Sequence, residues 1–209
     1  MSLGDTRFAD FLEQVAAKTP TPGGGAVASA VGAISAALAG MVVSYSVGKK
    51  SLAAHQEALT HAAGTLCKAR GVMLQLAEED AASYKLVNEL MKLPETDARR
   101  RAEWDTAVAA AVQAPMAVAA AATDLLRHFE TLAPITNRML RSDLAIAGVL
   151  AEATVRAALW NVEINASLLA DRTATMARAQ ELVERGRELL RRVEKACRED
   201  ASDGSGGGA

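Results

Sequence analysis

The chain has 209 residues, 50% of them apolar and 3% aromatic, with a formal net charge of −2 and a pI of about 6.0. This length favours a single domain, and the near-neutral charge argues against nucleic-acid binding, which usually leaves a basic footprint. Cys67 and Cys197 lie far apart without CxxC spacing, so neither a disulfide framework nor a zinc knuckle is expected. We therefore expect a reducing, cytoplasmic location, and the first ten residues lack the pattern of a signal peptide.

Helical periodicity begins with apolar residues at i, i+3, i+4 and i+7, which predict a short helix over residues 8–15. It stops at the Pro- and Gly-rich run 19–25, which cannot continue a helix. A second helix is predicted over residues 26–47. Small residues recur from this helix onward at every fourth position: Ala28, Gly32, Ala36, Gly40, Ser44 and Gly48. A ridge of such residues lets another helix approach closely.

Residues 19–48 contain no charged side chain and are long enough to span a bilayer. They are mostly Ala, Gly, Ser and Val, and a helix that is apolar all round lies either in a core or in a membrane. We expect a buried central helix and no membrane partner.

Ser51 is the expected N-cap of a long third helix that ends before Pro94. Its apolar seam, at alternating three- and four-residue spacing, includes the polar residues Arg70, Asp80 and Tyr84. An alanine-rich helix over residues 99–130 follows, and Pro115 is expected to kink it or split it.

Residues 131–141 form a predicted loop, after which Ser142 is expected to cap a helix reaching about residue 170. A last helix covers residues 173–197. We predict an all-α fold: one domain over residues 1–199, a bundle of about six helices, two of them long, packed closely through small residues. The Gly/Ser-rich tail 200–209 is predicted to be disordered.

Several catalytic motifs are missing from the chain. It has no HExxH, no GxSxG, no P-loop and no GxGxxG. The three histidines lack partners at helical ligand spacing, so we expect neither a metal nor a bound cofactor.

The Pro22-Gly23-Gly24-Gly25 turn opens a helix, where free backbone N–H groups attract anions. It is read either as a ligand cradle or as a turn that aims the helix and lets it pack closely. Asp80 lies on an apolar seam, where burial raises the pKa of a carboxyl and suits it to acid–base catalysis. The alternative for Asp80 is a structural ion pair with Arg70 or another basic residue.

Asp143 follows Ser142 at a predicted helix start, where an acidic side chain also offsets the helix dipole. Asn161 and Asn165 share its helix face, but Asn161 lies about 27 Å from Asp143 at 1.5 Å per residue. The asparagines either contact a ligand or bridge buried helices. Three arrangements follow for Asp143 and the asparagines: they contact opposite ends of one extended ligand, they belong to separate sites, or they meet in sites shared between subunits. Lys49 and Lys50 either bind an anionic group of a ligand or, as cations at a helix C-terminus, stabilise the helix through its dipole.

Taken together, these motifs resemble the cyclodeaminase/cyclohydrolase family of folate one-carbon metabolism over residues 8–195. Their order and spacing carry the resemblance: Phe11-Leu12, the run 19–28, Gly48-Lys49-Lys50, Asp80 four residues before Tyr84, Leu93-Pro94, Ala114-Pro115, Asn137, Ser142-Asp143 and the run 161–165. The chain departs from the family at Tyr84 (usually Phe), at Ala82 (commonly acidic), and before Asn137, where the usual glycine is absent.

The resemblance implies an all-helical homodimer or dimer of dimers that acts on a tetrahydrofolate substrate. The expected reaction is methenyltetrahydrofolate cyclohydrolase, which converts 5,10-methenyltetrahydrofolate and water to 10-formyltetrahydrofolate by metal-free acid–base catalysis. The alternatives are formiminotetrahydrofolate cyclodeaminase, which releases ammonia, and a non-catalytic helical scaffold.

The site expected from the resemblance divides its residues by role. Asp80 or Asp143 is the acid/base, and the Lys49-Lys50 pair meets the glutamate carboxylates of the substrate. The remaining substrate-binding candidates are Pro22, Gly23, Gly24, Gly25, Tyr84, Asn137, Ser142, Asn161 and Asn165.

Overall fold

The computed structural model describes residues 3–199, and within that range it is helical with no strand. Six α-helices form the fold: α1 (Phe8–Ala16), α2 (Gly24–Ser44), α3 (Gln56–Met91), α4 (Ala98–Leu132), α5 (Arg141–Ala166) and α6 (Thr173–Glu199). Short 3-10 helices are η1 (Leu3–Asp5), η2 (Lys50–His55), η3 (Ala133–Ile135) and η4 (Arg138–Leu140). The all-α prediction is confirmed, with α3 and α4 as the two longest helices. The predicted tail 200–209 lies outside the described residues.

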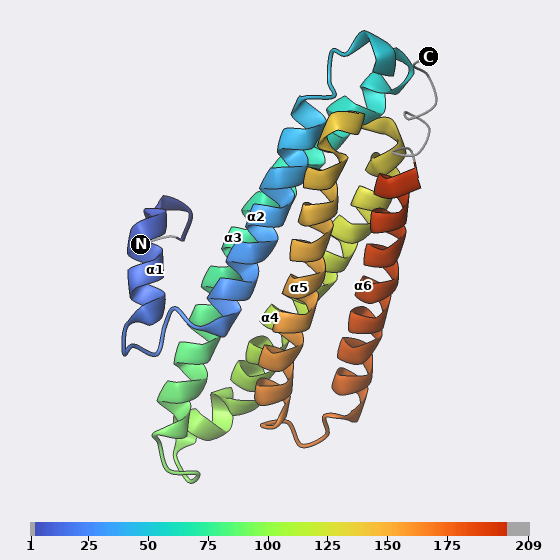
Figure 1. The fold of residues 1–209 in the computed structure, drawn as a ribbon. Coiled ribbons are helices and arrows are strands. Elements are labelled where there is room, and N and C mark those ends of the chain that lie inside the picture. The colour runs from blue at the N-terminus through green and yellow to red at the C-terminus, as the bar shows by residue number, and fades with distance from the viewer. Residues whose placement is uncertain (1–2, 200–209) are drawn as a thin grey trace, which may run out of the picture.

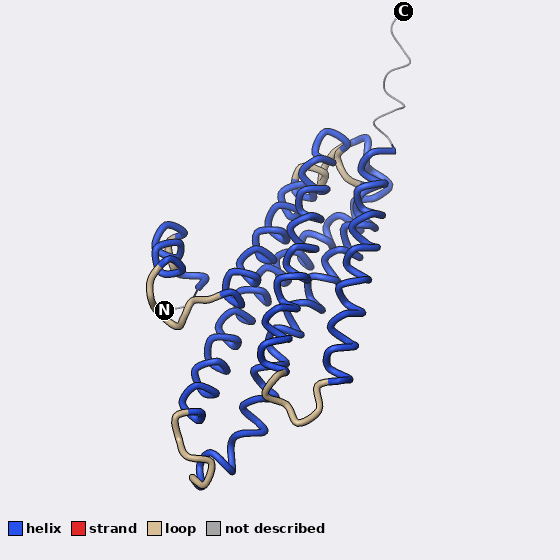
Figure 2. The backbone as a smooth tube through the Cα atoms, turned by 60° about the horizontal axis from the view of Figure 1, so that its bottom comes forward, coloured by secondary structure: helices blue, strands red, loops and turns tan. Residues whose placement is uncertain are grey.

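Helices α2 to α6 form an up-and-down bundle in which successive helices run antiparallel (Figure 1). Helix α2 packs against α3 and α5, and α4 packs against α3, α5 and α6. Helix α1 stands to one side, beside the start of α2, as the rotated view also shows (Figure 2). Only Phe11 of α1 is buried.

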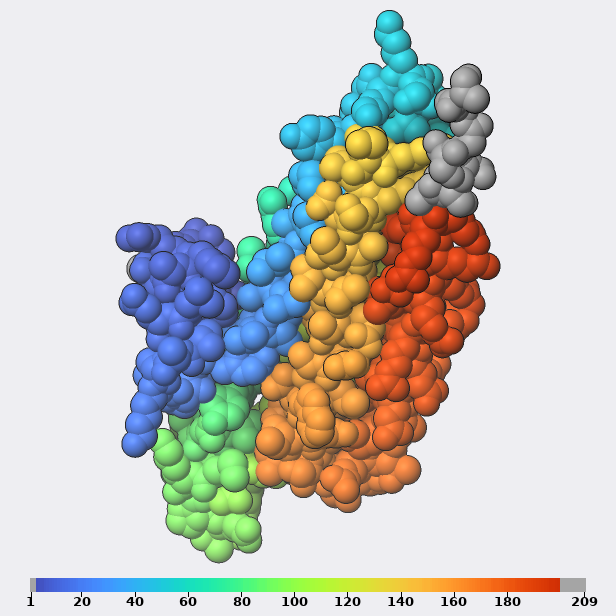
Figure 3. Space-filling view, in the orientation of Figure 1, coloured from blue at the N-terminus to red at the C-terminus, as the bar shows by residue number. Residues whose placement is uncertain are grey.

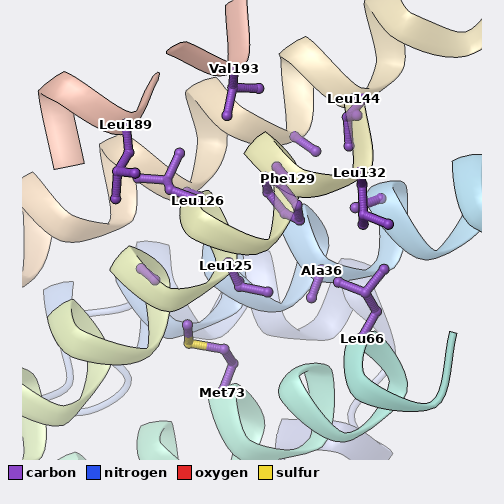
Figure 4. Packing of buried hydrophobic residues seen from close by; sticks show 14 of the residues in the cluster. Ala36, Leu66, Met73, Leu125, Leu126, Phe129, Leu132, Leu144, Leu189 and Val193 are labelled. Atoms are coloured by element: carbon purple, nitrogen blue, oxygen red, sulfur yellow. The ribbon is translucent and has the colours of Figure 1, made fainter. Parts of the chain in front are cut away.

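The core is built from aliphatic and small side chains, as the low aromatic content requires. Phe129 is its largest fully buried side chain, and it lies among leucines of α3, α4, α5 and α6 (Figure 4). Burial of this kind contributes about 25 cal/mol per Å² of apolar surface. The core therefore supplies the main force that holds the long helices in register.

The small-residue ridge of α2 packs closely only along its first half. A Cβ added at Gly32 would lie 2.9 Å from Met73 Sδ on α3 and 3.2 Å from Thr154 Cγ2 on α5. At Gly40 nothing lies within 4 Å, and Gly48 follows the helix as a turn residue with φ +79°. The prediction of close approach is therefore right for Gly32 and wrong for Gly40, where no neighbour covers the ridge.

Two expected helix starts were wrong, and one of the two effects expected of Pro115 is contradicted. Ser51 does not cap α3, because residues 50–55 form η2, and Leu52 (φ −115°, ψ 22°) breaks the helical path. Pro115 does not split α4, which runs unbroken through it. Ser142 is not an N-cap: α5 begins at Arg141, and the cap position is Leu140, which has no capping side chain.

Three helical stretches are long and apolar enough to cross a bilayer: Gly24–Ser44, Ala98–Ile135 and Arg138–Ala166. The bundle buries 56%, 61% and 44% of their most apolar windows, respectively. Packing against the other helices thus covers much of this surface, and least of it on α5.

Helix α2 is much shorter than α3, and this difference positions the site. The first turn of α2 faces Asp80, which is 24 residues into the 36-residue α3. Beyond Asp80, α3 continues past the start of α2 without that neighbour. The space left there is bounded by the Pro/Gly loop and the end of α5 (Figure 3).

Candidate active site

Asp80 lies directly against the glycine turn at the start of α2. Gly23 is the N-cap of the helix in an extended conformation, and Gly24 and Gly25 form its first turn. A Cβ added at Gly25 would lie 2.6 Å from Asp80 Cγ and 3.0 Å from Oδ1. The carboxyl group therefore occupies the space that any side chain at position 25 would fill.

The Asp80 carboxyl is half-buried and has no charged partner. No ion pair or hydrogen bond joins it to another residue in the range 3–199, and burial raises its pKa above 3.8. Arg70, the alternative partner considered from the sequence, is exposed and directs its guanidinium towards Cys67 Sγ, 4.0 Å away. A desolvated, unpaired carboxyl takes up and releases protons closer to neutral pH than an exposed one.

Two asparagines of α5 complete the wall opposite Asp80. Asn161 Nδ2 donates to Ala157 O at 3.2 Å, and its Oδ1 lies 3.4 Å from the position of a Cβ on Gly24. Asn165 Nδ2 donates to Ala111 O on α4 at 2.7 Å. Each amide uses one N–H for a backbone carbonyl, and its Oδ1 remains as an acceptor for a ligand.

The Asn165 bond explains why α4 tolerates an internal proline. Proline has no N–H, so the carbonyl of residue i−4, here Ala111, loses its helical donor. The side-chain amide of Asn165 supplies that donor from the neighbouring helix. Helix α4 consequently stays unbroken at Pro115, and Asn165 is fixed beside the pocket.

These side chains surround a cavity of about 190 Å³ between the starts of α2, the middle of α3 and the end of α5. It is lined by Pro20, Thr21, Gly23, Gly24, Gly25, Ala26, Asp80, Ala81, Tyr84, Asn161, Ile164 and Asn165. We call it the Asp80 pocket. Seven of the residues singled out from the sequence meet there, and Pro22 lines a neighbouring hollow between α1 and α3.

The other candidates lie at the far end of α2 and α5. Asn137 caps η4, because its Oδ1 accepts a hydrogen bond from the backbone N–H of Met139. The backbone N–H of Asn137 donates to Ser46 Oγ at 2.8 Å. Lys49 and Lys50 are exposed near that end, as is Ser142 at the start of α5. Within one chain, these residues and Asp143 do not reach the Asp80 pocket.

Five lining residues were not singled out from the sequence: Pro20, Thr21, Ala26, Ala81 and Ile164. Of these, Pro20 and Thr21 belong to the Pro/Gly run, and Ala26 follows it directly. Among residues 3–199, no three His, Cys, Asp or Glu side chains are grouped so that they could hold a metal ion.

Comparison with known proteins identifies related sequences and a structure of the same fold. The family model described as formiminotransferase-cyclodeaminase matches residues 7–185. A methenyltetrahydrofolate cyclohydrolase of Methylorubrum extorquens is 30% identical over 183 residues, which are 86% of this chain and 88% of that protein. The formimidoyltransferase-cyclodeaminase of Mus musculus is 31% identical over 174 residues, which are 81% of this chain but 32% of the mouse protein.

A crystal structure of formiminotetrahydrofolate cyclodeaminase from Thermotoga maritima has the same fold, with a TM-score of 0.86 at 29% identity. The match covers 95% of this chain and 98% of the Thermotoga chain. Because the family model spans most of the sequence and the fold agrees over nearly its whole length, the chain belongs to the formiminotransferase-cyclodeaminase family.

Proposed function

We propose that the protein is a folate one-carbon enzyme that hydrolyses 5,10-methenyltetrahydrofolate to 10-formyltetrahydrofolate in the Asp80 pocket. The observation that carries the proposal is the unpaired, half-buried carboxyl of Asp80, held against Gly25 in a pocket that Asn161 and Asn165 also line. The named cyclohydrolase relative supports it, since the match covers 88% of that protein.

The reaction needs one group that accepts and returns protons. Water attacks the electrophilic methenyl carbon, a C–O bond forms, and Asp80 takes a proton from the water. The carbinol then loses its hydroxyl proton as the C=O bond forms and the bond from carbon to N5 breaks, while N5 takes the proton held by Asp80. One proton is released overall. A positioned general acid–base contributes about 10²- to 10⁴-fold to such a step.

In this proposal the two asparagines orient the substrate. The pteridine ring presents N–H and amino donors, and the Oδ1 atoms of Asn161 and Asn165 are the acceptors left free by their backbone bonds. The first turn of α2 leaves backbone N–H groups for a carbonyl or anionic edge of the ligand.

The competing function is formiminotetrahydrofolate cyclodeaminase, which the Thermotoga structure favours because it matches nearly the whole chain. Its reaction closes N10 onto the formimino carbon and releases ammonia, and it also requires a positioned acid–base. Absorbance separates the two reactions: a cyclohydrolase consumes the methenyl chromophore, whereas a cyclodeaminase generates it from formiminotetrahydrofolate.

The test compares the wild type with Asp80→Asn and with Glu79→Gln, a matched change of the neighbouring exposed carboxylate. We expect Asp80→Asn to lower kcat about 10²- to 10⁴-fold and Glu79→Gln to leave it unchanged. If the wild type processes neither substrate, the protein is better described as a scaffold. If Asp80→Asn retains full turnover, Asp80 is not the acid–base.

We further propose that the protein is a homodimer joined through the outer face of α2 and α5, which are adjacent in the bundle (Figure 1). Large exposed apolar side chains gather on this face, which is typical of an interaction surface. They are Ile34, Ile146, Val149, Trp160 and Ile164. Trp160 and Ile164 are each 72% exposed.

An antiparallel pairing of the two α5 helices about their midpoint would set Asp143 of the partner subunit opposite Ile164, at the rim of the Asp80 pocket. This arrangement would give the far-end candidates access to the site. Sedimentation velocity tests the dimer: Trp160→Glu should convert it to a monomer, and Val72→Glu, a matched change on α3, should not. A wild type that sediments as a monomer at micromolar concentration would contradict the proposal.

A further inference from the structure

A second and larger cavity, of about 760 Å³, adjoins the Asp80 pocket along the C-terminal third of α3. We call it the α3 cleft. Pro20, Thr21, Ala81 and Tyr84 line both spaces, so the pocket opens directly into the cleft. The other lining residues are Ala82, Lys85, Asn88, Glu89 and Lys92.

The cleft exists because α2 begins opposite Asp80, leaving the following turns of α3 without a helix on that side. Ala81, Lys85, Asn88 and Lys92 recur at spacings of four, three and four, so they share one helix face. The opposite side of the same turns is buried against α4 through Val87 and Leu90. The cleft face is therefore held rigidly by a packed core while remaining open.

The unpaired charges in the cleft are positive. Lys85 and Lys92 form no ion pair within the described part of the chain, whereas Glu89 Oε2 lies 3.8 Å from Arg99 Nη2. Along the helix axis, Lys85 lies about 7 Å and Lys92 about 18 Å from Asp80. The order outward from the reacting carboxyl is thus an aromatic side chain, a lysine, an amide and a second lysine.

We propose that the α3 cleft binds the aminobenzoyl-glutamate part of the folate; this inference rests on the proposed function of the Asp80 pocket. With the pteridine beside Asp80, the aminobenzoyl ring lies along Ala81 and the ring of Tyr84. Asn88 faces the amide, and the ammonium groups of Lys85 and Lys92 bind the carboxylates of the first and further γ-linked glutamates. Lys49 and Lys50, at the far end of α2, are then not the tail-binding residues of the same chain.

The size of the effect follows from the exposure of the lysines. Solvent-exposed ion pairs are weak, so losing both ammonium groups should raise KM roughly 3- to 20-fold. The preference for glutamylated substrate should also weaken with added salt, since exposed charges are screened over about 10 Å at 0.1 M ionic strength. The value of kcat should not change, because neither lysine touches the reacting carbon.

The experiment measures KM and kcat for three methenyl substrates: the tetrahydropteroate, which lacks glutamate, the monoglutamate and the γ-linked triglutamate. The enzymes are the wild type, Lys85→Gln/Lys92→Gln, and the charge-matched control Lys68→Gln/Lys195→Gln on exposed surface elsewhere. We expect the cleft variant alone to raise KM for both glutamylated substrates, most for the triglutamate, with kcat and the pteroate KM unchanged.

Each other outcome overturns the inference. An equal rise of KM for the pteroate would mean that the lysines act through structure, and no rise at all would place the tail elsewhere. A rise found instead with Lys49→Gln/Lys50→Gln would assign the tail to the far end of α2. Turnover of the pteroate by the wild type tests the proposed function separately, and its absence with all three substrates would remove that function and this inference together.

Discussion

Gly25→Ala is the most informative single substitution, because it adds one methyl group at the point where Asp80 meets α2. The new Cβ would lie 2.6 Å from Asp80 Cγ, and an ordinary contact of 3.4 Å requires the carboxyl carbon to retreat about 0.8 Å. Asp80 Oδ2 is closer still and must also move. The backbone of α2 need not shift, since the obstructing group is the end of a side chain.

A displacement of about 1 Å in a catalytic group costs roughly 10²-fold in rate, so we expect kcat/KM of Gly25→Ala to fall by about that factor. The fold should tolerate the change, because alanine is favoured over glycine in a helix by about 1 kcal/mol, which offsets the local strain. The assay is the loss of methenyl absorbance, together with urea unfolding to measure the free energy of unfolding.

Gly40→Ala is the matched control in the same helix. Nothing lies within 4 Å of a Cβ there, so it should stabilise the protein by up to about 1 kcal/mol with unchanged activity. If Gly25 acts only through Asp80, adding Gly25→Ala to Asp80→Asn should cause no further loss of rate. Full activity of Gly25→Ala would refute the reasoning, as would a further large loss in the double variant.

Two further predictions concern stability. Burial raises the pKa of Asp80 in the folded protein above 3.8, so the unfolded chain loses that proton first and the charged carboxylate destabilises the fold at higher pH. Asp80→Asn should therefore raise the free energy of unfolding at pH 7. The gain should shrink as the pH falls through the raised pKa of Asp80 and be absent below about 3.8, where the carboxyl is protonated in both states. A less stable variant at pH 7 would contradict this. Asn165→Ala should cost about 1–3 kcal/mol, because it leaves the buried Ala111 carbonyl without a donor. Pro115→Ala restores a backbone N–H that can bond to the Ala111 carbonyl, so Asn165→Ala should cost less stability in the Pro115→Ala variant than in the wild type. If urea unfolding showed the two costs to be additive, the link would be disproved.

Asp80 shows which properties of a site residue can be predicted from the sequence. Its place on an apolar seam predicts burial and a raised pKa, because burial of a helix face follows from spacing along one segment. The glycine turn was likewise visible, since three glycines after two prolines end one helix and start another. What spacing alone left open was whether Asp80 is paired, and the tertiary structure shows it facing glycine rather than arginine.

The link between Asn165 and Pro115 could not be predicted from the sequence. Each residue is conspicuous alone, but the bond joins Asn165 to a carbonyl 54 residues away on another helix. The predictions for Ser51 and Ser142 failed because a hydroxyl residue near a helix start caps it only when the backbone turns at that residue. Here α3 starts at Gln56 and α5 at Arg141, so neither serine occupies the cap position.

The sequence by itself thus determined the helical class, the number of helices, the composition of the core and seven of the residues that line the Asp80 pocket. Only the tertiary structure decided which candidates meet: the glycine turn, Asp80 and the two asparagines at one place, and Lys49, Lys50, Ser142 and Asp143 at the other end. The physical reason is that periodicity reports the face of one helix over a few turns. Register between helices depends on loop lengths and core packing, and it was the offset of short α2 along long α3 that created both the pocket and the cleft beside it.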